Sequence, residues 1–280
     1  MASRNDVARL AALMRGARTL VLTGAGVSTD AGIPDHRGVG SPTRRTVEYG
    51  DFVLHEMWQR WVWWRSELSW QILERTRPTT AHRALAALEG AGDVIGVTTQ
   101  NVDRLHSTAG SRNVAELHGR YDAVVCLHCD RRFPRADVST LIRDHNPGRE
   151  FPPLPPDHVE VLAARDRGAA AACSLVVPAC PSCGGLLKPD VVFFGEPIPE
   201  AAVRHALALA NECDVVLAVG TSLAVSTGMW VLMQARESGA RLAIVNRGPT
   251  EADRLADLRL EGGAGEVLGG VAEILLGEGG

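Results

Sequence analysis

The chain has 280 residues, which is enough for one large domain or for a large domain with a small companion. Hydrophobic residues make up 45% and charged residues 22%, an ordinary composition for a chain with an ample core. The formal net charge of −4 argues against a general binder of nucleic acids or of anionic membranes. Lys188 is the only lysine among 29 basic residues, which argues against catalysis by a lysine side chain.

The first predicted elements are an amphipathic helix and a buried strand. Apolar residues recur at helical spacing before residue 15, and a continuous apolar run follows at 19–23. The helix segment carries Asp6 early and lacks the order of a signal peptide. No apolar run in the chain reaches the roughly 20 residues that a membrane helix needs. We therefore expect a cytoplasmic protein.

The first strand runs into the sequence "TGAGVSTDAGIPDHRG" at 23–38. Gly24 and Gly26 fit the tight strand-to-helix turn in which backbone N–H groups face a pyrophosphate. Thr29 stands where the usual dinucleotide fingerprint has a third glycine, so a purely structural turn is an equal alternative. Thr29 and the preceding Ser28 add hydroxyls that suit a phosphate or serve as ordinary helix caps.

A tryptophan-rich segment follows at 38–77 and holds five of the six tryptophans. Their number predicts a helical insertion with its own core, and a hydrophobic wall for a ligand is the alternative. The next strand, at 93–98, leads into "TQNVDRLH" at 99–106. Loops that leave parallel strands are where α/β proteins place ligand groups, so the amide and carboxylate side chains in this loop are candidates for a site.

His118, in "LHGRYD", lies where the sheet domain meets a second insertion. It is a candidate base at a domain crevice, and by spacing alone it could equally be a structural histidine. The insertion carries two Cys-x-x-Cys pairs, at Cys126, Cys129, Cys180 and Cys183. Two such pairs close a tetrahedral thiolate site, so we predict one structural Zn²⁺; four unrelated buried thiols are the alternative.

The sequence "LKPDVVFFGE" at 187–196 returns the chain to the sheet domain. Its apolar centre is interpreted as an exposed strand edge that pairs with an extended peptide, or as an ordinary internal strand. Two further strands, at 214–220 and 241–246, end in "GTSLAV" and "NRG". Glycine, threonine, serine and asparagine at strand ends suit phosphates, ribose hydroxyls or adenine. Three such polar strand ends together favour a dinucleotide site.

Helical patterns at 80–88, 200–211 and 227–238 separate these strands. Strands that alternate with helices predict an α/β fold with a doubly wound parallel sheet and ligands at the carboxyl ends of its strands. The tryptophan segment and the cysteine segment, with its proline-rich stretch, interrupt this alternation and are expected to fold beside the sheet.

Taken together, "GAGVSTDAGIPDHRG", "TQNVDRLH", "LHGRYD", the cysteine pairs, "LKPDVVFFGE" and "GTSLAV" resemble the sirtuins in order and spacing, and the class II branch most. The resemblance implies a Rossmann-like NAD-binding domain at 1–37, 78–120 and 187–280. It further implies a small domain built from the helical insertion at 38–77 and a zinc-binding module at 121–186. NAD and an acyl-lysine peptide are expected to meet in the cleft between the domains.

The implied reaction is NAD-dependent deacylation of protein lysine, with release of nicotinamide and O-acyl-ADP-ribose. His118 resembles the family's catalytic base, and Asn101 its catalytic amide. The residues that resemble cofactor contacts are Gly24, Ala25, Gly26, Thr29, Asp35, His36, Arg37, Gln100, Asn101, Asp103, Gly220, Thr221, Ser222, Asn246, Arg247 and Ala264. The segment that resembles the peptide-binding strand comprises Val192, Phe193, Phe194, Gly195 and Glu196.

Two positions depart from the family pattern. His36 stands where the family usually has Phe or Tyr, near the reacting ribose, which puts efficiency and acyl preference in doubt. Ala264 replaces a Cys that this branch often has near the adenine. The alternatives are mono-ADP-ribosyl transfer, a preference for longer or lipoyl chains, and a non-catalytic zinc-bearing binding module. No Tyr-x-x-x-Lys pair supports a dehydrogenase, and the sequence leaves the oligomeric state open.

Overall fold

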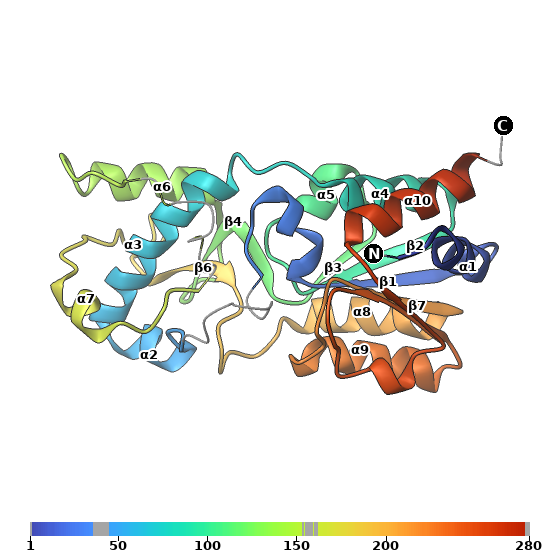
Figure 1. Ribbon diagram of the computed structural model, residues 1–280. Coiled ribbons are helices and arrows are strands. Elements are labelled where there is room, and N and C mark those ends of the chain that lie inside the picture. The colour runs from blue at the N-terminus through green and yellow to red at the C-terminus, as the bar shows by residue number, and fades with distance from the viewer. Residues whose placement is uncertain (1, 36–44, 153, 155–158, 160–161, 278–280) are drawn as a thin grey trace.

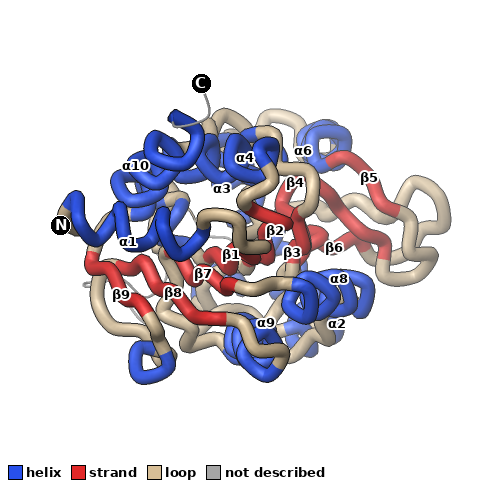
Figure 2. The backbone as a smooth tube through the Cα atoms, turned by 90° about the vertical axis from the view of Figure 1, so that its right-hand side faces the viewer, coloured by secondary structure: helices blue, strands red, loops and turns tan. Residues whose placement is uncertain are grey.

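Six parallel strands form the larger of two sheets, in the order β3-β2-β1-β7-β8-β9, which Figure 2 shows edge to edge. This computed structural model describes residues 2–35, 45–152, 154, 159 and 162–277. The strands are β1 (Thr19–Thr23), β2 (Val94–Thr99), β3 (Val114–Glu116), β7 (Val215–Val219), β8 (Arg241–Asn246) and β9 (Leu258–Glu261). The order is that of a doubly wound dinucleotide-binding sheet, as the sequence predicts.

Helices cover both faces of this sheet (Figures 1 and 2). One core cluster joins a face to α1 (Arg4–Met14), α4 (Thr80–Ala91) and α10 (Ala264–Gly277). A second cluster joins the other face to α8 (Glu200–Glu212) and α9 (Ser226–Glu237). The central strands β1 and β7 are buried along their whole length, which explains their continuous apolar sequences.

The sequence analysis identified the four inner strands of this sheet but neither edge strand. The edge strands β3 and β9 have only three and four residues, and each carries a charged residue. They pair on one side only, so neither needs the apolar run by which a buried parallel strand is identified.

A second lobe lies beside the first and is built on an antiparallel sheet in the order β5-β4-β6 (Figure 1). Its strands are β4 (Gly119–Cys126), β5 (Arg132–Pro134) and β6 (Leu187–Val191), and its helices are α2 (Tyr49–Leu54), α3 (Glu56–Leu73), α6 (Arg135–Asp144) and α7 (Arg167–Ala172). β6 pairs with β4, so this sheet extends past the expected boundary at residue 187. The division into domains stays a prediction.

The tryptophans of α3 form core rather than an open ligand wall. Trp58 and Trp63 are fully buried, and Trp61, Trp64 and Trp70 are partly buried against the same cluster. Among the described residues, no helix is both long and apolar enough to cross a membrane.

A fully buried ion pair joins α3 to α6 inside this core. Arg135 Nη2 lies 2.7 Å from Glu67 Oε1, and both side chains have no exposed surface. The hydroxyl of Ser139 also donates to the Glu67 carboxylate. The Arg135 guanidinium lies over the rings of Trp63 and Trp70, 5.2 and 5.5 Å from their centroids. Arg135 also donates to the Ser66 hydroxyl, and Arg143 lies 3.9 Å from the other Glu67 oxygen, so aromatic faces, two hydroxyls and a second guanidinium surround the pair.

Glu67→Ala should lower the free energy of unfolding by roughly 3–5 kcal/mol, because it leaves the Arg135 charge buried without a partner. Urea unfolding followed by tryptophan fluorescence measures this change. The control is Glu56→Ala, which breaks an exposed pair with Arg60 on the same helix and should have little effect. Equal effects of the two substitutions would contradict a stabilising role for the buried pair.

Candidate active site at the carboxyl edge of the sheet

Two glycine-containing turns meet where the strand order reverses between β1 and β7. The N–H of Gly26 donates to the carbonyl of Gly220 over 2.8 Å. A Cβ atom on Gly26 would lie 2.8 Å from the Gly220 Cα, and one on Gly24 would lie 2.7 Å from the Thr221 Cβ. Gly24 and Gly26 are thus required for the approach of the turns. The crevice at such a switch point is where doubly wound sheets bind ligands.

The loop after β2 contributes a buried polar network to this crevice. Asn101 Nδ2 donates to the Gly24 carbonyl over 3.0 Å and to Ser28 Oγ over 3.1 Å. The Ser28 hydroxyl donates in turn to Asp103 Oδ2 over 2.7 Å. The other oxygen of Asp103 accepts the N–H of Leu105, at the start of α5 (Leu105–Ala109). Burial raises the pKa of Asp103, and these two hydrogen bonds act in the opposite direction.

His118 lies between the loop after β2 and the first turn of α9. Its Nδ1 is 2.9 Å from the carbonyl oxygen of Gln100, and its Nε2 is 3.0 Å from Thr227 Oγ1. The Gln100 side chain joins the same network, since its Nε2 donates to Thr227 and its Oε1 accepts the hydroxyl of Thr221. The structure thus places Gln100, a predicted cofactor contact, beside His118, the predicted base, with side chains from α9 and from the turn after β7.

The contacts of His118 determine its tautomer. A carbonyl oxygen can only accept, so Nδ1 carries the proton and Nε2 presents its lone pair. Burial lowers the pKa of His118 from 6.5, while the bond to Gln100 raises it. The positive end of the α9 dipole also disfavours an imidazolium at this place. His118 is therefore neutral near pH 7, with Nε2 as a proton acceptor.

Two further histidines lie buried behind the glycine turn. His106 Nε2 is 2.9 Å from the hydroxyl of Thr23, which also bonds to Thr99. The ring of His82 is 4.6 Å from that of His106, and its Nδ1 bonds to the hydroxyl of Thr79. Burial lowers the pKa of His82 to about 4 and that of His106 well below 6.5. Both rings are neutral and support the carboxyl ends of β1 and β2.

The far end of the crevice lies at β8 and β9. Asn246 is buried and donates to the carbonyls of Arg247 and Gly248. The Arg247 guanidinium lies over Gly263, where a Cβ atom would be 2.6 Å from Nη2. Ala264 follows as the first residue of α10. These groups lie together at the carboxyl ends of β8 and β9.

Of the remaining predicted cofactor residues, some lie in the part of the chain that the structure describes and others do not. Ala25 lies in the one-turn helix Ala25–Val27, and Thr29 Oγ1 donates to the Gly26 carbonyl. Asp35 is half-buried, and Ser222 accepts the N–H of Glu251 through its carbonyl. His36 and Arg37 lie outside the described residues, so their roles stay predictions.

Sequence reasoning did not identify Thr227, His82 or His106 as parts of the site. Ser28 was noted only as a hydroxyl for phosphate or for a cap. Thr227 is the first residue of the helix predicted at 227–238, and nothing in its sequence surroundings indicates a contact with His118. His106 belongs to the polar loop "TQNVDRLH", which is the one signal that pointed toward it.

The four predicted metal ligands come together in the second lobe. The sulfur atoms of Cys126, Cys129, Cys180 and Cys183 all lie within 4.8 Å of one another. Tetrahedral zinc with Zn–S bonds of about 2.3 Å places its sulfur atoms about 3.8 Å apart. The distance is 3.5 Å from Cys126 to Cys183 and 4.0 Å from Cys129 to Cys180. The thiols therefore fit one closed zinc site.

The expected peptide-binding strand at 192–196 is wrong as a strand, because β6 ends at Val191 and a turn follows. Gly195 has a φ of +80°, and the N–H of Glu196 donates to the Phe193 carbonyl. The Glu196 carboxylate accepts the N–H of Phe193 and pairs with the buried Lys188. These contacts form a turn at the edge of the second sheet, and its backbone also bonds to the His118 carbonyl through the N–H of Val192 and to the N–H of Tyr49 through the Phe194 carbonyl.

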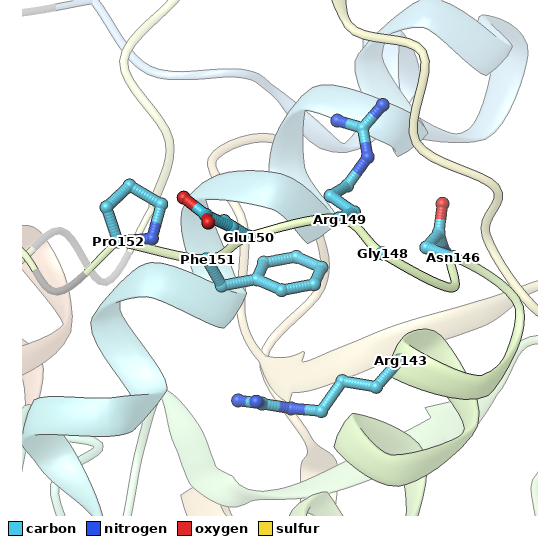
Figure 3. A pocket seen from close by; sticks show the side chains of 7 residues that line it. All are labelled: Arg143, Asn146, Gly148, Arg149, Glu150, Phe151 and Pro152. Atoms are coloured by element: carbon cyan, nitrogen blue, oxygen red, sulfur yellow. The ribbon is translucent and has the colours of Figure 1, made fainter.

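A hollow of about 510 Å³ lies elsewhere on the second lobe, at the loop after α6 (Figure 3). It contains none of the predicted site residues. Arg143 lies over the ring of Phe151, while Arg149 lies over Trp64. In Figure 3 the two arginine side chains extend to opposite sides of Phe151, so they do not converge on one ligand.

Known proteins similar to this chain share these features of sequence and fold. A model of the Sir2 family matches residues 24–227. The NAD-dependent protein deacetylase 1 of Mycobacterium avium is 41% identical over 272 residues, covering 97% of this chain and 96% of that protein. The protein of the same name from Streptomyces coelicolor is 43% identical over 276 residues, with 96% and 90% covered. A solved structure of a Sir2 mutant with a p53 peptide and NAD matches at 29% identity with a TM-score of 0.71, covering 98% of each chain.

Proposed function

The chain belongs to the Sir2 family, the sirtuins, and we propose on this premise that it is an NAD-dependent protein-lysine deacylase of the deacetylase type. The observation that carries the proposal is His118, held neutral with its Nε2 lone pair in the crevice beside Gln100. The enzyme transfers the acyl group of a modified lysine to ADP-ribose and releases nicotinamide.

The donor set in the crevice fits NAD. Hydroxyls, amides and a closely packed glycine turn lie at the switch point, and the Arg247 guanidinium packs over Gly263 at its far end. When bound, NAD would supply an electrophilic ribose carbon for the acyl oxygen and a ribose hydroxyl to which the acyl group is transferred. Gln100, Asn101 and Asp103 would hold its nicotinamide and ribose, and the turns after β1, β7 and β8 its phosphates and adenosine.

The residues of this chain perform proton transfer and positioning. His118 accepts a proton from a ribose hydroxyl at Nε2, while its Nδ1–H stays bonded to the Gln100 carbonyl. Ser28 donates a direct hydrogen bond to Asp103, and Asn101 donates to the Ser28 hydroxyl, so the two residues hold the carboxylate in place as a chain. The buried walls exclude water, which strengthens these fixed dipoles near developing positive charge.

Acyl-lysine peptides are the proposed partners, and the edge of the second sheet is the proposed binding place. The turn at 192–196 follows edge strand β6, and Phe194 in it is about half exposed. Lys188 donates to the Val191 carbonyl over 2.6 Å and to Glu196 over 3.1 Å, and these two hydrogen bonds stabilise the turn. We keep the pairing of a peptide with this segment as a proposal.

Zinc is structural in this account. Four thiolates leave no open coordination position, so the metal holds β4 and the segment before β6 together and takes no part in the reaction. None of the six cysteines forms a disulfide, which supports the proposed cytoplasmic location, because reducing compartments keep cysteines reduced.

The proposed function is tested by incubating the enzyme with peptides that carry acetyl, longer aliphatic or lipoyl groups on lysine, with and without NAD. Mass spectrometry of the peptide identifies the product. We expect loss of the acyl group only when NAD is present. A peptide that keeps its acyl group and gains ADP-ribose would identify mono-ADP-ribosyl transfer instead, and an unchanged peptide would overturn the proposal.

The rate should stay high well into mildly acid solution. The pKa of His118 is lowered from 6.5, so the neutral base persists below that pH and is lost only as the pH falls through the lowered value. We expect kcat/KM to reach half of its plateau below pH 6.5. Asp103→Asn removes the carboxyl group of the site whose pKa is also shifted by burial. If His118 causes the fall in rate at acid pH, this variant should lose its rate over the same pH range. A half-point at or above 6.5 would contradict this assignment.

A further inference from the structure

Thr227 contacts both the proposed base and its neighbouring amide. It is the second residue of α9 and is buried, with Oγ1 3.0 Å from His118 Nε2 and 3.1 Å from Gln100 Nε2. No residue type in the motifs of the sequence indicates this contact. Thr227 therefore occupies a place in the site for which neither the sequence motifs nor the reaction scheme above assigns a role.

The direction of each hydrogen bond follows from the chemistry of the groups. Nε2 of His118 must accept, because Nδ1 donates to a carbonyl, so the Thr227 hydroxyl donates its one proton to Nε2. Thr227 then accepts from Gln100 Nε2, and Gln100 Oε1 accepts from Thr221. If the Gln100 amide were turned over, its oxygen would face Thr227, and the Thr227 hydroxyl would have to donate its proton to that oxygen. The lone pair on His118 Nε2 would then face the Thr227 oxygen without a proton between them. Only one arrangement satisfies every group around a neutral His118.

We propose that Thr227 is a positioning residue for the base: its hydroxyl orients the His118 imidazole until the substrate hydroxyl binds Nε2, and it holds the Gln100 amide in place throughout. An imidazole nitrogen has one lone pair, so a substrate hydroxyl that binds Nε2 replaces the Thr227 proton there. Thr227 still accepts from Gln100 and keeps the amide in place. The role rests on the proposed deacylase function and adds a residue to it.

The effect of the Thr227 hydroxyl can be tested separately from the effect of its side-chain volume. A Cβ atom on the next residue, Gly228, would lie 3.2 Å from the Gln100 side chain, so the first turn of α9 packs directly against that amide. Val231 and Leu232 bury the following turn. Thr227→Val keeps the branched volume and removes only the hydroxyl, whereas Thr227→Ser keeps the hydroxyl.

The test compares two readouts in wild type, Thr227→Val and Thr227→Ser. Exchange of labelled nicotinamide into NAD, in the presence of an acetyl-lysine peptide, reports cleavage of NAD before proton transfer to His118. Formation of O-acyl-ADP-ribose reports the complete reaction. We expect Thr227→Val to lower kcat for O-acyl-ADP-ribose roughly tenfold or more, with a smaller loss of exchange. Thr227→Ser should stay within about threefold of wild type on both readouts.

Thr140→Val on α6 is the matched control, since this exposed threonine bonds only to the carbonyl of Ala136 among the contacts the structure gives. It should leave both rates unchanged. If Thr227→Val does not fold, Thr227→Ala takes its place against Thr227→Ser. Product formation by Thr227→Val within twofold of wild type would overturn the proposal, as would equal impairment by Val and Ser. Wild-type enzyme without NAD-dependent deacylation would instead overturn the proposed function.

Discussion

Replacing His118 with alanine should lower the rate of O-acyl-ADP-ribose formation by roughly 10²–10⁴-fold, the usual contribution of a positioned general base. The imidazole is the only group in the network around Gln100 that presents a lone pair and can then keep a proton. NAD binding should change little, because the proposed cofactor contacts come from the turns after β1, β2, β7 and β8 and not from the His118 ring. Steady-state rates and calorimetric titration with NAD measure the two quantities separately.

The control for this substitution is His145→Ala. His145 is an exposed histidine at the end of α6 whose Nδ1 bonds to the Leu141 carbonyl, so its loss should leave the rate unchanged. Retention of more than a third of the wild-type rate by His118→Ala would remove His118 as the base. A large loss of NAD affinity would show that it acts in binding rather than in proton transfer.

Loss of the zinc should unfold the second lobe and abolish activity. Purified protein should contain one zinc per chain, and Cys129→Ala should contain none. The binding free energy of structural zinc is folding free energy, about 10–16 kcal/mol in small zinc peptides, so its loss is far larger than that of a single contact. Metal analysis gives the zinc content, and thermal unfolding followed by circular dichroism gives the stability.

Cys173→Ala is the matched control for the zinc site. Cys173 is a partly buried thiol in the same lobe that bonds to the Arg60 carbonyl and lies apart from the four clustered sulfurs. Zinc content and melting temperature should match those of wild type. Active enzyme that contains no zinc, or a Cys129→Ala variant that keeps both zinc and stability, would contradict the structural role.

The sequence predicted the inner sheet well because burial leaves a strong pattern. β1 and β8 begin and end at the predicted residues, since every position of a central parallel strand faces apolar neighbours. The cysteine pairs were equally informative, because closing a tetrahedral site requires that residue type at that spacing. Local chemistry of this kind is visible without knowing the fold.

Contacts between elements distant in the chain were not visible in this way. Thr227 is 109 residues from His118, and only the pairing of β2, β1 and β7 brings α9 to that ring. The turn at 192–196 was expected as a strand because its residues are apolar. The carboxylate of Glu196 and the positive φ of Gly195 close it instead. These short-range contacts override the preference of apolar residues for extended backbone, a preference that depends strongly on context.

The central claim is that the acyl group leaves lysine for ADP-ribose, and one labelled reaction tests it directly. A peptide with a carbon-labelled acetyl group on lysine is incubated with enzyme and NAD, and all products are quantified together. We expect equal amounts of nicotinamide, unmodified lysine peptide and O-acyl-ADP-ribose, with the label on the last. Label recovered as free acetate without consumption of NAD would contradict it.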